Sequence, residues 1–143
     1  MVGPARIFKL ADVAQQMVGG FLLAGPFVVT EEVWVLATSM SWIQGVFTVA
    51  IVFAIGYGAL YKADADRDPD RETEVAGVPV RFISLMTVSF GSVALLALVF
   101  DAPGTFLSER GLTQLEQLAV SVRAISVGAV FAVVGAATAD SVF

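Results

Sequence analysis

The chain has 143 residues, of which 57% are hydrophobic, and its formal net charge is −5. Soluble domains average about 45–50% apolar residues, so the composition excludes an ordinary soluble domain and indicates an integral membrane protein. The absence of Cys and His excludes a thiolate nucleophile, a disulfide framework and the usual zinc ligand sets, and the acidic balance argues against nucleic acid as a partner.

Four apolar segments are long enough to cross a bilayer, whose hydrocarbon core needs about 20 helical residues. The connections between them are short, which favours antiparallel neighbours in one bundle. We therefore predict an all-α fold, a four-transmembrane-helix bundle that forms a single domain over residues 1–143. The predicted spans are residues 17–37, 42–61, 82–100 and 118–138.

The first segment carries two adjacent carboxylates, Glu31 and Glu32. The apolar run before them, residues 17–30, reaches only about 21 Å as a helix, so a span must continue through both glutamates. An ionisable group at that depth is costly and marks a functional site by default. Pro26 removes a backbone N–H donor in the same segment and distorts the helix there. The predicted ion pathway consists of Glu32, Glu31, Thr30 and Pro26.

Two alternatives for the glutamates stay open. Both side chains could meet lipid headgroups at the outer interface, or one could belong to a structural ion pair. Gly25 and Glu32 lie seven residues apart and share a helix face, so a cleft over Gly25 would lead toward Glu32, whereas Glu31 points about 100° away. Small residues allow helices to approach closely, and the predicted packing positions are Gly20, Gly25 and Gly128.

Arg123 is the candidate ion-pair partner of the glutamates. It lies about five residues inside the outer end of the fourth segment, and Glu32 lies about as far inside the outer end of the first. Since pairing reduces the cost of burying a charge, we predict that Arg123 pairs with Glu31 or Glu32. The alternative is that its side chain snorkels to the outer surface.

Lysine and arginine indicate the orientation. They gather before the first segment and in the 62–81 loop, whereas Arg110 alone lies on the other side. Both termini are therefore predicted to be cytoplasmic. Alternating aspartates at residues 64–70 are similar to the start of an EF-hand loop, but that motif's glycine and final glutamate are missing, so we expect a solvated acidic loop. The acidic, lysine-poor balance suggests a halophilic host.

Two further patterns are interpreted as structural. Residues 54–58, AIGYG, are similar to the filter string of potassium channels, but they end an uninterrupted span and lack the threonine. No nucleophile has a base beside it, and no phosphate-binding loop or metal cluster is present in the sequence. The chain is therefore predicted not to be an enzyme, with no catalytic residues and no cofactor.

The run Pro26-Phe-Val-Val-Thr30-Glu31-Glu32-Val-Trp34 resembles a family of small integral membrane proteins of archaea and bacteria. The first helix of that family carries the pattern P-x-x-x-T-x-E-x-W, which Pro26, Thr30, Glu32 and Trp34 match here. The function of the family is uncharacterised, so the resemblance implies a membrane protein and adds no activity. Because Glu31 is not a motif position, the resemblance favours Glu32 over its neighbour.

The function predicted from these patterns is a small homo-oligomeric cation channel in the cell membrane. Copies of Glu32 would form a ring of carboxylates that selects or gates inorganic cations, because such rings concentrate cations in pores. One alternative is a proton-coupled transporter or proton-responsive channel in which Glu32 titrates. The other is an accessory or assembly membrane protein that transports nothing. The expected partners are the lipid bilayer, cations and further copies of the chain.

Overall fold

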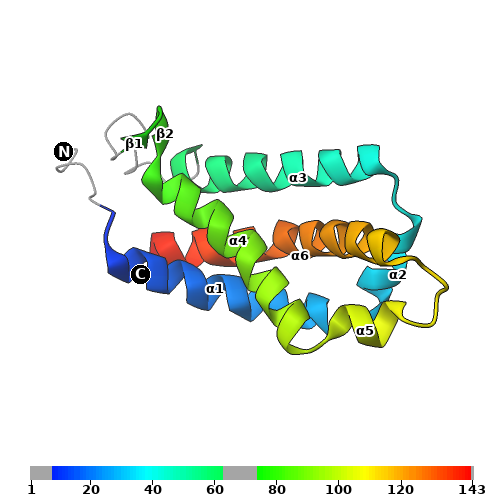
Figure 1. The fold of residues 1–143 in the computed structure, drawn as a ribbon. Helices are drawn as coiled ribbons and strands as arrows, with labels where there is room; N and C mark the ends of the chain where they lie inside the picture. Colours follow the sequence, from blue (N-terminus) through cyan, green and yellow to red (C-terminus); the bar gives the residue numbers. More distant parts are fainter. Residues whose placement is uncertain (1–7, 63–73, 143) are drawn as a thin grey trace, which may run out of the picture.

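The computed structural model describes residues 8–62 and 74–142, and it is almost entirely helical in these ranges (Figure 1). The acidic residues 64–70, for which we expect a solvated loop, lie outside the described residues. The elements in chain order are α1 (Leu10–Val28), α2 (Glu31–Ser39), α3 (Trp42–Tyr57), the π-helical turn η1 (Gly58–Lys62), β1 (Glu74–Val75), β2 (Val78–Pro79), α4 (Val80–Val99), α5 (Ala102–Leu107) and α6 (Gln114–Val142).

The predicted all-α membrane bundle is confirmed, but its first span is not a continuous helix. Within residues 8–62 and 74–142, three helices are long and apolar enough to cross a membrane: α3 together with η1, α4, and α6. α1 and α2 make a fourth span only as a pair, and they are bent by 77° where they meet. The predicted first span, residues 17–37, is therefore a bent pair of helices, and the distortion expected at Pro26 is a break between Val28 and Glu31.

Local sequence explains where the other helices begin. Ser41 and Gln44 form a reciprocal capping box at the start of α3, with Gln44 N donating to Ser41 Oγ at 3.2 Å and Ser41 N donating to Gln44 Oε1 at 2.7 Å. Thr113 and Glu116 do the same for α6. Each box satisfies backbone donors that the first turn of a helix leaves without a partner.

The connection after α4 contains a helix that the sequence reasoning missed. Asp101 adopts a left-handed conformation at φ 50°, which ends the preceding helix, and its carboxylate then accepts from Gly104 N at 3.3 Å. Pro103 fits in the first turn of α5 because its missing N–H would lack a partner there in any case. Pro103 and Gly104 therefore lie in the first turn of α5, directly after the end of α4.

α6 is the centre of the bundle and packs against α1, α2, α3 and α4. Its closest neighbour is α1: a Cβ built on Gly19 would lie 2.1 Å from the carbonyl oxygen of Gly135. Only glycine fits at that crossing. Figure 1 shows α1, α3 and α6 running along the bundle, while α4 crosses obliquely in front of α6 and α1.

Two of the three predicted packing glycines lie in tight contacts. A Cβ on Gly20 would meet Val88 at 3.1 Å, and one on Gly128 would meet Val93 at 2.8 Å. The prediction for Gly25 is wrong, because a Cβ there would meet nothing within 4 Å. Gly25 is also not among the residues that line the recess at Glu31 and Glu32.

The two ends of the bundle differ in what they contain (Figure 1). The hairpin end holds the start of α1, the end of α6 and the β1–β2 hairpin, in which Glu74 pairs with Pro79. The α2 end holds α2, α5 and the starts of α3 and α6. Residues 54–58 lie within α3 and η1, so the filter-like string is helical.

Candidate functional site

The break between α1 and α2 is built by residues of the P-x-x-x-T-x-E-x-W pattern. Thr30 Oγ1 donates to the carbonyl of Pro26 at 2.5 Å, and Trp34 Nε1 donates to the carbonyl of Val28 at 3.0 Å. Carbonyls at the end of a helix have no partner within it, and in a membrane span they need one. Three motif residues, Pro26, Thr30 and Trp34, therefore interrupt the helix and satisfy the backbone that the interruption frees.

Trp34 also fixes α2 against the rest of the bundle. Its side chain is buried and packs with Val28, Ala37 and Leu107 in one apolar cluster. Its ring centroid lies 6.2 Å from that of Phe106 in α5. The indole thus anchors the bend by packing and by a hydrogen bond together, which the sequence reasoning did not assign to it.

The bend places both glutamates in the first turn of α2, where both are exposed. Negative side chains are favourable at this end of a helix because the helix dipole is positive there. Glu31 and Glu32 line one surface recess of about 480 Å³, together with Val35, Thr38 and neighbouring residues of α2. Both glutamates therefore border the same recess, although they are about 100° apart around the helix.

The predicted ion pair between Arg123 and the glutamates is not formed. Arg123 Nη1 donates to the carbonyl of Met40, and Nε donates to the carbonyl of Ala119 at 3.3 Å. Glu31 pairs instead with Arg110, at 3.5 Å between Oε1 and Nη2. Arg123 and Glu32 lie at similar depths in their apolar segments, but this did not predict their contacts. The bend brings the end of α2 to Arg123 and the beginning of α2 to Arg110.

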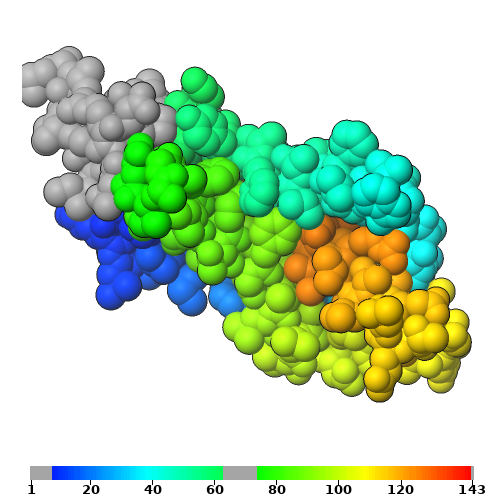
Figure 2. All heavy atoms as spheres, turned by 45° about the horizontal axis from the view of Figure 1, so that its top comes forward, coloured from blue at the N-terminus to red at the C-terminus, as the bar shows by residue number. Residues whose placement is uncertain are grey.

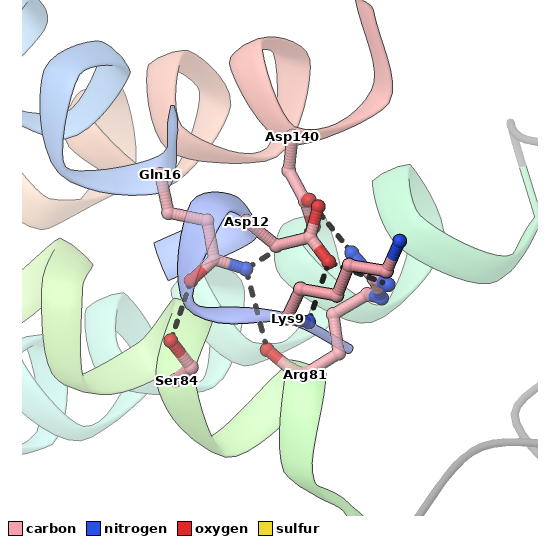
Figure 3. A network of polar contacts seen from close by, with 6 residues as sticks. All are labelled: Lys9, Asp12, Gln16, Arg81, Ser84 and Asp140. Atoms are coloured by element: carbon pink, nitrogen blue, oxygen red, sulfur yellow. Dashed lines mark hydrogen bonds and ion pairs between the residues drawn. The ribbon is translucent and has the colours of Figure 1, made fainter. Parts of the chain in front are cut away.

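A second polar cluster, which the sequence reasoning missed, lies at the hairpin end (Figure 3). Arg81 of α4 donates from Nη1 to Asp140 of α6 at 2.7 Å and from Nη2 to Asp12 of α1 at 3.3 Å. The side chains of Arg81 and Asp140 are 1% and 0% exposed. A charge pair this deeply buried joins three helices at one point.

Gln16 completes this cluster from α1. Its Nε2 donates to Asp140 Oδ2 at 3.1 Å and to the backbone carbonyl of Arg81 at 3.5 Å, while its Oε1 accepts from Ser84 at 2.6 Å (Figure 3). The Phe8 ring covers the guanidinium of Arg81 at 5.1 Å. The signal in the sequence was weak, because Gln16, Arg81 and Asp140 only flank apolar segments.

The two polar regions can do different things. In the hairpin-end cluster, the carboxylates of Asp12 and Asp140 and the amide of Gln16 contact other residues of the same cluster. The cluster therefore stabilises the contact of α1, α4 and α6. The recess leaves two carboxylates open to a solute. Among residues 8–62 and 74–142, no group of three His, Cys, Asp or Glu side chains could hold a metal ion.

Comparison with known proteins gives one match. The family described as "Putative integral membrane protein (DUF2391)" matches residues 6–140, which is most of the chain. No curated protein and no solved structure matches.

Proposed function

The chain belongs to this family of integral membrane proteins, and from that premise we propose that it conducts inorganic cations past Glu31 and Glu32. The proposal adds an activity to what the match supports, which is a multi-pass membrane protein. In it, Glu32 selects or gates the cations, and the break between α1 and α2 positions the carboxylate.

The single observation that carries the proposal is the open recess at the break. Glu31 retains 61% exposure of its side chain despite its pair with Arg110, and Glu32 is also exposed. Irregular backbone at membrane depth is tolerated where protein buries it or where it lines water. Two uncovered carboxylates beside such a backbone suit a water-lined path better than contact with hydrocarbon, and they attract cations.

The packing of the bundle favours a path between copies of the chain. α6 is surrounded by α1, α2, α3 and α4, and its inward face is filled by small buried side chains such as Ala129, Ala132 and Ala136. The recess opens on the outside of this bundle. A second copy facing it would enclose the carboxylates, and closed rotational symmetry would repeat Glu32 around an axis.

Pro26 and Thr30 contribute to this function through the backbone. The Pro26 carbonyl is taken by the Thr30 hydroxyl, so it is not free to coordinate a cation in this conformation. We assign these two residues to holding the bend, and the cation contacts to the carboxylates.

The test is cation flux into liposomes that contain the purified protein. Wild type is compared with Glu32→Gln, which removes one charge from the recess, and with Glu109→Gln, which removes an exposed charge from the 108–113 connection outside it. The proposal predicts passive flux that Glu32→Gln abolishes or reorders among cations and that Glu109→Gln leaves unchanged.

Two outcomes would replace the proposal. Uptake that proceeds only with coupled acidification would identify a proton-coupled transporter or a proton-responsive channel with Glu32 titrating. No flux from well-folded wild type across several cations and pH values would favour an accessory or assembly protein. In such a protein, Glu31 would only form the ion pair with Arg110.

A further inference from the structure

A large groove lies between α3 and α6 at the α2 end of the bundle. Its volume is about 610 Å³, within the range of ligand-binding sites, and apolar side chains make up almost all of its lining. Figure 2 shows the first half of α6, in orange, open beside the beginning of α3. The main apolar contributors are Trp42, Val46 and Val49 from α3, and Leu115, Leu118 and Val122 from α6.

One cationic side chain, Arg123, lies in this apolar lining. Its stem rests against α3, where a Cβ added to Gly45 would meet Arg123 Cγ at 3.3 Å. A guanidinium carries five N–H donors, and the two contacts of Arg123 both go to neutral backbone carbonyls, those of Met40 and Ala119. Among the residues that the structure describes, no carboxylate balances its charge.

This charge needs an anion from outside the bundle. Glu31, which was predicted as a partner of Arg123, is paired with Arg110, and a cation beside lipid is costly unless it finds a counter-charge. The level of the groove suits a headgroup, because Arg123 contacts the turn between α2 and α3, and Trp42 beside that turn is 74% exposed. Tryptophan is enriched at the level where hydrocarbon meets headgroups.

We propose that the α3–α6 groove binds an anionic phospholipid, with the phosphate at Arg123 and an acyl chain along the apolar lining. Arginine binds phosphate through several charge-assisted hydrogen bonds, and basic pockets between membrane helices are known to take anionic headgroups. The proposal does not rest on the proposed cation path, since the groove and the recess are lined by different residues.

The test is lipid binding by the purified full-length chain in detergent, measured by native mass spectrometry. Phosphatidylglycerol and phosphatidylcholine with identical acyl chains are the probes. Wild type is expected to prefer phosphatidylglycerol, and Arg123→Gln should reduce that preference about tenfold, the effect of losing one hydrogen-bonded charge contact. Arg123→Lys should keep most of it, because the charge remains.

Two further variants complete the experiment. Arg110→Gln removes a partly exposed arginine outside the groove and should leave the preference unchanged. Val49→Trp fills the groove from α3 and should weaken binding of both lipids. The proposal is overturned if Arg123→Gln keeps the wild-type preference for phosphatidylglycerol. It is also overturned if Arg123→Gln and Val49→Trp shift the dimer population without changing lipid binding. In that case, the occupant of the groove is a second copy of the chain.

Discussion

The hairpin end and the α2 end of this bundle carry the same kinds of charged side chain in opposite environments. At the hairpin end, Arg81 and Asp140 are 1% and 0% exposed and hold each other at 2.7 Å. At the α2 end, Arg110 and Glu31 are 35% and 61% exposed and lie 3.5 Å apart. The first pair is locked into the packing of three helices, whereas the second leaves its carboxylate open to a solute.

This difference shows that position within an apolar segment does not decide what a charge does. The glutamates interrupt the first apolar segment, yet the bend turns them outward into a recess. Arg81 and Asp140 flank their segments, yet α1 covers both with Asp12 and Gln16. A buried, fully hydrogen-bonded pair fixes one arrangement of helices, and an exposed pair adds little stability.

The largest effect is expected from breaking the buried pair. Asp140→Leu leaves the Arg81 guanidinium buried without the carboxylate that lies 2.7 Å from its Nη1. Removing one partner of a buried pair costs about 3–5 kcal/mol, so unfolding in mixed micelles should require much less denaturant. The double variant Arg81→Met/Asp140→Leu should recover most of the loss. A single variant as stable as wild type would show that the hairpin end is not held by this pair.

A smaller effect is expected at the helix break. Trp34→Phe keeps an aromatic ring in the cluster but removes the donor to the buried carbonyl of Val28. An unsatisfied buried acceptor costs about 1–3 kcal/mol in the free energy of unfolding. Trp42→Phe is the matched control, because Trp42 is 74% exposed. Equal stability of the two variants would mean that the indole hydrogen bond does not hold the bend.

The smallest effect is expected from the exposed pair. Arg110→Gln removes the charge that faces Glu31, and pairs this exposed contribute about 0–1 kcal/mol. Unfolding should hardly change, and the small difference should vanish in high salt because mobile ions screen exposed charges. A loss as large as that of Asp140→Leu would remove the contrast between the two ends.

The sequence predicted the membrane bundle and the approximate spans because length and hydropathy determine them. It could not show the 77° bend, because apolar residues resume at Val33 after the two glutamates, so length and hydropathy still fit one span. Pro26 marked a distortion there, but its direction depends on the contacts of Thr30 and Trp34. The family resemblance rested on these same residues, and the match over residues 6–140 confirms it.

The polar contacts were harder to predict because they join distant parts of the chain. Arg81 and Asp140 are 59 residues apart, and each alone is typical of a helix end at an interface. Arg123 was expected beside a glutamate from its depth alone. Its partner is the carbonyl of Met40, and no side-chain pattern reveals a backbone acceptor.

The central claim is that the charges at the α2 end conduct cations and that those at the hairpin end hold the fold. Cation flux per folded protein, measured side by side in liposomes for three proteins, tests this claim most directly. The proteins are wild type, Glu32→Gln, and Arg81→Met/Asp140→Leu. We expect Glu32→Gln to lose or alter the flux while remaining as stable as wild type, and the double variant to conduct like wild type. Normal flux in Glu32→Gln together with its loss in the folded double variant would contradict the account and place the conducting charges at the hairpin end.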